Sequence, residues 1–76
     1  MAIDRIDVID IYNQGIYFIL IDGEEFFNCS AEEYGRGAYD LVISFANALG
    51  KKFNKFVYTD SICEQDLADH YPGIKL

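Results

Sequence analysis

An aspartate–glycine pair between two apolar runs constrains the fold of this chain more than any other feature. Asp22 and Gly23 separate the apolar run 16–21 from a second run at 24–29. Asp-Gly in this position is a strong signal for a two-residue β-hairpin, because both residues adopt a positive φ at little cost. The pair therefore predicts two antiparallel strands joined by a tight turn.

The hairpin also predicts which side chains face each other across the two strands. Counting outward from the turn places Ile19 opposite Phe26 and Phe18 opposite Phe27. Each pair matches apolar with apolar, which favours this register, since cross-strand pairs stabilise a sheet.

Four other segments complete the predicted order β-β-β-α-β-α. Residues 6–12 and 55–59 are rich in β-branched and aromatic residues and predict strands. Residues 38–49 predict the main helix, and 61–70 a short C-terminal helix. We therefore expect a single α+β domain over 1–76. A three-stranded antiparallel meander and a fourth strand, parallel to its neighbour, pack on the main helix.

An apolar stripe predicts which face of the main helix is buried. Leu41, Val42, Phe45 and Leu49 fall on one side of a helical projection. Gly50 stands where a glycine commonly ends a helix, so we expect the helix to stop there.

Two capping boxes predict helix starts. Ser30, with Glu33 three residues later, predicts an N-cap and its return partner. Ser61, with Glu64, repeats the pattern and predicts the N-cap of the C-terminal helix.

The charge balance excludes some partners and permits others. Thirteen acidic residues face six basic ones, for a formal net charge of −7. This balance argues against direct binding of nucleic acid or of anionic membranes, which require basic surfaces. It permits attraction to a basic protein surface. Half of the chain is hydrophobic, including six Phe and six Tyr, which excludes disorder and leaves aromatics for a contact surface.

The cysteines and the single histidine predict neither a metal site nor catalysis. Cys29, Cys63 and His70 provide at most three good zinc ligands, where a structural site needs four. On one helix, Cys63 and His70 would lie roughly 10 Å apart along the axis, too far for a nucleophile and its base. We expect no cofactor, no enzymatic activity and two reduced thiols, although a disulfide between them stays open.

No segment predicts export or membrane insertion. The first charged residue of the chain is an acid, Asp4, whereas the N-terminal region of a secretory signal is basic. The longest apolar run, 16–21, has the length of a strand and is too short to cross a membrane. We expect a cytoplasmic protein.

Clustered acids predict a partner-binding surface. Acids crowd the hairpin and the entry to the helical segment, with tyrosines next to them in the chain. Fixed rows of carboxylates resemble the phosphates of a nucleic acid and fit a groove built for one. The predicted contact residues are Asp22, Glu24, Glu25, Glu32, Glu33, Tyr34 and Tyr39.

In length, charge, aromatic content and element order, the chain resembles the small acidic anti-CRISPR proteins of phages, which share no common motif. The resemblance implies a non-enzymatic inhibitor that binds a basic nucleic-acid-binding surface of a bacterial defence complex, as a DNA mimic. Two alternatives stay open. One is a homo-oligomeric structural or adaptor module that buries its spare aromatics. The other is an immunity protein for a basic toxin nuclease.

Overall fold

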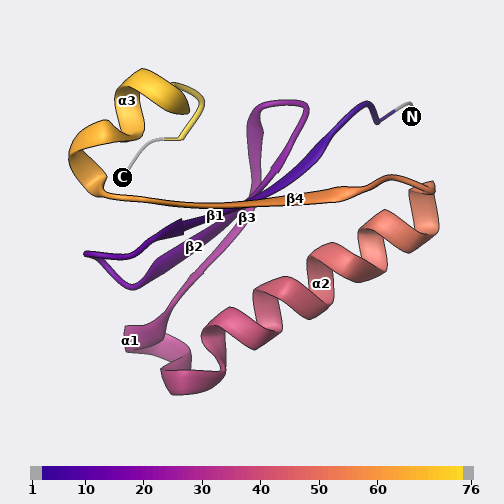
Figure 1. Ribbon diagram of the computed structural model, residues 1–76. Helices are drawn as coiled ribbons and strands as arrows, with labels where there is room; N and C mark the ends of the chain where they lie inside the picture. The colour runs from indigo at the N-terminus through magenta and orange to yellow at the C-terminus, as the bar shows by residue number, and fades with distance from the viewer. Residues whose placement is uncertain (1–2, 75–76) are drawn as a thin grey trace.

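The computed structural model describes residues 3–74 and shows an α+β fold (Figure 1), which confirms the predicted class and element order. A four-stranded mixed sheet has the strand order β3-β2-β1-β4. Helix α2 crosses one face of the sheet, and α3 lies on the other side. The elements are β1 Ile6–Ile11, β2 Ile16–Ile21, β3 Glu24–Ser30, α1 Ala31–Tyr34, η1 Gly35–Gly37, α2 Ala38–Phe53, β4 Val57–Ile62, η2 Glu64–Asp66 and α3 Leu67–His70.

The sheet combines an antiparallel meander with one parallel pair, as predicted. β1 pairs antiparallel with β2, and β2 pairs antiparallel with β3. β4 then pairs in parallel with β1. The chain therefore leaves the sheet at one edge, β3, and returns through α2 to the other edge, β4.

The hairpin forms at the predicted turn, but its register differs from the prediction. Asp22 and Gly23 have φ angles of 54° and 84°. Ile19 lies opposite Phe27, because the register shifts between Ile19 and Leu20 and Phe26 is the extra residue of a β-bulge.

The pairs predicted for Ile19 and Phe18 are therefore both wrong. Phe18 faces Asn28 instead of Phe27. The bulge turns both phenylalanines toward the helix: the rings of Phe26 and Phe27 lie 6.0 and 5.0 Å from the ring of Phe45. Packing of two rings on one helix residue is a physical reason for the bulge.

Small residues line the buried face of α2. Ala38, Val42, Ala46 and Gly50 are spaced by four and are fully or nearly fully buried against the sheet. Leu41, expected on this face, is exposed. The small side chains let the helix lie close to the strands, and the larger Phe45 and Leu49 pack at its flanks.

The helix continues past Gly50 to Phe53, so the predicted end at Gly50 is wrong. Asn54 adopts the left-handed conformation that ends the helix, with φ 55° and ψ 49°. Gly50 is needed for a different reason: a Cβ there would lie 2.8 Å from the carbonyl oxygen of Lys55 and 2.8 Å from Val57 Cγ2. The glycine lets the chain turn back from α2 into β4.

The other face of the sheet has its own core. Ile9, Ile11, Phe18 and Leu20 pack there in one cluster with residues of the C-terminal segment. The buried covering residues are Leu67 and Ile74, with Tyr71 and Ile62 partly buried beside them. The C-terminal segment is thus an integral layer of the fold.

One of the two predicted N-caps forms, at Ser30, and Glu33 returns to the Ser30 hydroxyl instead of its backbone N–H. Ser30 Oγ accepts a hydrogen bond from the N–H of Glu33, and the hydroxyl also contacts the Glu33 carboxylate, both at 3.3 Å. Ser61 caps no helix, because β4 extends through it and the next helical turn begins at Glu64. Its hydroxyl donates to Oδ2 of Asp10 on the neighbouring strand, at 3.1 Å.

Candidate functional site

The predicted contact residues lie at two ends of the sheet. Asp22, Glu24 and Glu25 lie at the β2–β3 turn, whereas Glu32 and Glu33 follow the far end of β3. A seven-residue strand separates the two groups by about 20 Å. The structure therefore does not bring all of these acids together into one continuous patch.

Asp22 has a structural role in addition to its charge. Its Oδ1 accepts hydrogen bonds from the N–H groups of Asp4 and Arg5, at 2.8 and 2.9 Å. The carboxylate therefore fastens the segment before β1 to the hairpin. Glu25 also has a local partner, since it accepts a hydrogen bond from the side chain of Asn28 at 3.0 Å.

Tyr39, in the first turn of α2, packs against the sheet. Its ring makes an edge contact with Tyr17, with 5.5 Å between ring centroids. It also lines a shallow hollow of about 340 Å³ with Asp10, Thr59, Asp60 and Ser61. Packing on Tyr17 leaves this ring only partly available to a partner.

The carboxyl ends of β1, β3 and β4 meet at one end of the sheet, where the β1–β2 turn links both flanks. The N–H of Ala31 donates to the carbonyl oxygen of Gly15 at 2.8 Å, which joins the turn to α1. On the other flank, the N–H of Glu64 donates to Asn13 Oδ1 at 2.9 Å, and the Gln14 amide bonds the Glu64 carboxylate. The three segments are therefore held as one surface.

This carboxyl-end surface combines exposed acids with two exposed tyrosines. The side chains of Tyr12 and Tyr34 are 62% and 55% exposed. Three of the seven residues of this surface, Glu32, Glu33 and Tyr34, were predicted from the sequence, and the other four were missed. We define it as Tyr12, Gln14, Glu32, Glu33, Tyr34, Glu64 and Asp66, all exposed.

The missed part carried a signal in the sequence. β1 and β4 were expected to lie in the same sheet, and parallel strands bring their carboxyl ends together. Tyr12 directly follows β1, and Glu64 and Asp66 follow β4. In the structure the neighbouring Cys63 is the main cause that raises the pKa of the Tyr12 phenol above its ordinary value.

The acidic charge is almost entirely free of internal neutralisation. Among residues 3–74, the ion pair between Arg5 and Asp7, with 3.0 Å between Nε and Oδ2, is the one salt bridge. Of the thirteen acids, Asp7 is buried, Asp10 is half-buried and the others are exposed. The negative field of the molecule therefore reaches solvent.

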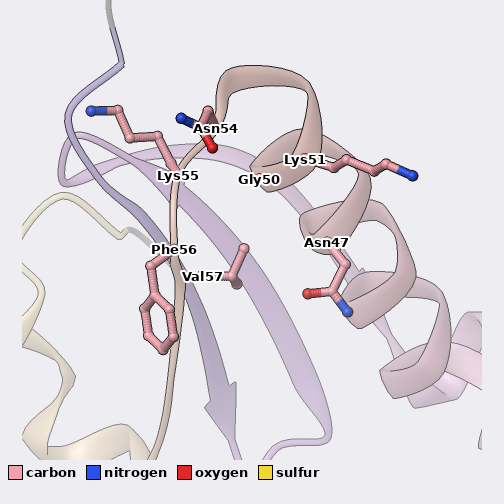
Figure 2. A pocket seen from close by; sticks show the side chains of 7 residues that line it. All are labelled: Asn47, Gly50, Lys51, Asn54, Lys55, Phe56 and Val57. Atoms are coloured by element: carbon pink, nitrogen blue, oxygen red, sulfur yellow. The ribbon is translucent and has the colours of Figure 1, made fainter.

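A larger hollow lies between the end of α2 and the start of β4. It has a volume of about 530 Å³ and is lined by Asn47, Gly50, Lys51, Asn54, Lys55, Phe56 and Val57. Figure 2 shows the Lys51 and Lys55 side chains pointing away from each other, out of the hollow. The two cations do not converge, so the hollow lacks the geometry of an anion site.

The described residues include no group of side chains that could hold a metal ion. Between residues 3 and 74, no three His, Cys, Asp or Glu side chains are grouped to hold a metal ion. Cys29 and Cys63 are free, as expected. They flank opposite edges of the sheet, about 14 Å apart at the strand spacing, so a disulfide cannot join them. His70 is exposed at the end of α3.

None of the helices formed by residues 3–74 has the length and apolar character needed to cross a membrane. Comparisons of this chain with protein-family models, with curated proteins and with solved structures give no match. No activity or partner is therefore transferred to it from a relative.

Proposed function

We propose that this protein is a non-enzymatic inhibitor that binds a basic, nucleic-acid-binding surface of another protein. One observation carries the proposal: nearly all carboxylates are exposed, and among residues 3–74 a single one is paired with a cation. An acidic protein that neutralised its charge internally would have little long-range attraction for a basic groove.

The carboxyl-end surface is our choice for the contact region. Its acids come from α1 on one flank and from η2 on the other, with the β1–β2 turn between them. The hydrogen bonds that join these segments hold their backbones, and the Glu64 carboxylate, in place before binding, which lowers the ordering cost of association. Tyr12 and Tyr34 supply exposed aromatic side chains of the kind that dominate binding energy at interfaces.

The proposed partner is a bacterial defence complex of the CRISPR type. Small size, strong negative charge and a short sheet packed on helices support this choice through the resemblance to phage anti-CRISPR proteins. Binding in the DNA-entry groove would block target DNA by mimicry of its phosphates. A basic toxin nuclease presents the same chemistry, so a binding screen should include one.

The first experiment measures whether the protein competes with DNA for a guide-loaded CRISPR effector complex. We expect inhibition that weakens as salt rises from about 0.05 to 0.5 M, because exposed charges are screened. A panel of effector complexes and one basic toxin nuclease identifies the class of partner. Affinity that does not change with salt for any bound member contradicts the proposal.

Two charge-matched variants locate the contact. Glu32→Lys with Asp66→Lys reverses two charges on the carboxyl-end surface, and Glu24→Lys with Glu25→Lys reverses two at the hairpin. Both variants have the same net charge, so a weaker long-range electrostatic attraction to the partner affects them equally. We expect the first variant to lose at least about tenfold more affinity than the second. Equal losses would mean that net charge alone acts, and a larger loss for the hairpin variant would move the contact there.

A further inference from the structure

The two edges of the sheet differ in how they are protected from other strands. β3 has the β-bulge at Phe26 and two exposed glutamates, Glu24 and Glu25, at its start. Bulges and edge charges are the usual devices that prevent edge-to-edge pairing. β4, Val57–Ile62, contains no lysine, proline or bulge, and its four central residues are exposed. Its one charged residue is Asp60, whose carboxylate accepts hydrogen bonds from the Tyr71 hydroxyl and the Ser61 N–H. β4 is therefore an open pairing edge.

The backbone groups that β4 leaves free follow from one hydrogen bond. The N–H of Tyr12 donates to the carbonyl oxygen of Ile62 at 3.2 Å, so Ile62 turns its backbone groups toward β1. Backbone groups alternate in direction along a strand. Val57, Thr59 and Ser61 therefore direct their N–H and C=O groups away from the sheet. The N–H of Ser61 already donates to Oδ1 of Asp60 at 2.9 Å, so five of these six groups are free.

We propose that a second copy of this chain pairs with that edge, with the two β4 strands antiparallel about a two-fold axis at Thr59. Val57 of one copy then faces Ser61 of the other, and Thr59 faces Thr59. All three are outward-directed residues, so each pairing is of the hydrogen-bonded type. About four new backbone bonds form in total, because the Ser61 N–H of each copy stays bonded to its Asp60. The two sheets join into one continuous sheet, with both α2 helices on the same face.

The side chains favour this register over one in which the two-fold axis is shifted by one residue. On the face away from α2, Phe56 meets Ile62 of the second copy, and Tyr58 meets Asp60 of the second copy. The Arg5 guanidinium lies 4.0 Å from the centre of the Tyr58 ring, so it comes near that Asp60 and complements its charge. Moving the axis to Asp60 would place two carboxylates directly opposite each other, which is unfavourable.

The pairing also accounts for an exposed aromatic pair. The Phe56 side chain is 72% exposed, and its ring packs edge-on against Tyr58 with centroids 4.8 Å apart. These two rings lie at the open edge, with Arg5 over the second. A second β4 strand would cover part of this apolar surface, which favours association.

The test uses variants at the two edges. Thr59→Pro removes an outward N–H and leaves the ladder to β1 intact, since proline is tolerated on an edge strand where its nitrogen faces solvent. Thr59→Lys keeps the backbone but sets two ammonium groups against each other at the axis. Asn28→Lys places the same residue on the exposed β3 edge and is the matched control. Circular dichroism establishes that each variant is folded.

Sedimentation equilibrium between about 1 µM and 1 mM gives the oligomeric state. We expect wild-type protein and Asn28→Lys to be dimers at about 100 µM, and both Thr59 variants to dissociate at least 100-fold more readily. The dimer should tighten with added salt, because each copy carries a net charge of −7, whereas partner binding should weaken. A wild-type monomer at 1 mM, or dissociation caused by Asn28→Lys and not by Thr59→Lys, would overturn the proposal.

Discussion

The Tyr71 hydroxyl donates a 2.6 Å hydrogen bond to Oδ2 of Asp60, and this contact fastens the C-terminal segment to the edge strand β4. Burial, and then the bond to the Asp60 carboxylate, raise the pKa of Tyr71 to about 12 from an ordinary value of 10. The same segment places Leu67 and Ile74 over the second core cluster. The protonated phenol is therefore linked to the docking of a whole layer of the fold.

This linkage predicts a loss of stability in alkaline solution. The native state holds the Tyr71 proton more tightly than the unfolded chain does. Its contribution is therefore complete below pH 10 and is lost as the pH rises from 10 toward 12. Tyr71→Phe should lower the free energy of unfolding at pH 7 by about 1 kcal/mol and make the decline above pH 10 shallower. Urea unfolding at intervals between pH 7 and 12 measures both, and an identical alkaline decline in the variant would contradict the linkage.

Substitutions at two glycines, Gly50 and Gly37, distinguish a close backbone approach from a general effect of chain flexibility. At Gly50 a Cβ would meet the Lys55 carbonyl at 2.8 Å, whereas a Cβ at Gly37 meets nothing within 4 Å. We expect Gly50→Ala to destabilise the protein by about 2 kcal/mol, despite the better helix propensity of alanine. Gly37→Ala should be neutral or stabilising by up to about 1 kcal/mol, since its φ of −78° suits alanine. Chemical denaturation measures the free energy of unfolding of both variants. Equal effects of the two substitutions would contradict the close approach at Gly50.

Asp22 should respond to substitution as a structural residue. Asp22→Ala removes the acceptor for two backbone N–H groups and puts alanine at a φ of 54°, so we expect a loss of about 2 kcal/mol. Asp22→Asn keeps an acceptor oxygen and tolerates this φ, so it should cost less than about 0.5 kcal/mol. Thermal unfolding of both variants provides the comparison. A strong loss with asparagine would mean that charge, and not geometry, matters at this position.

Short-range signals in the sequence predicted the elements and their order. Asp22-Gly23 fixes the hairpin because positive φ is a local property of those two residues. The bulge at Phe26 escaped prediction, because it results from two rings packing on Phe45, a residue far along the chain. The helix end was wrong for the same kind of reason: Gly50 is required by contact with Lys55 and Val57.

The candidate surface was predictable only in part. Glu32, Glu33 and Tyr34 are consecutive in the chain, so the sequence by itself predicts that they share a surface. Tyr12 and Glu64 stand more than fifty residues apart in the chain and become neighbours when β1 and β4 pair in parallel. Their proximity depends on strand order, which no local pattern specifies.

The Arg5–Asp7 pair provides the last prediction. Asp7 is only 5% exposed, and Arg5 Nε bonds both of its carboxylate oxygens, at 3.1 and 3.0 Å. Arg5→Met keeps most of the apolar stem but leaves the buried carboxylate without its cation and removes the contact with the Tyr58 ring. Because the arginine side chain is itself solvated, we expect a measurable loss of stability that is smaller than that for a fully buried pair.

A second substitution shows where that loss comes from. Asp7→Leu in the Arg5→Met background removes the stranded charge from beside Leu20, its cross-strand neighbour in β2. The double variant should therefore regain at least half of the lost stability, since an apolar replacement of both partners is commonly close to neutral. Urea unfolding of the two single variants and the double variant completes a double-mutant cycle. Additive losses would mean that Arg5 stabilises the fold through Tyr58 and not through Asp7.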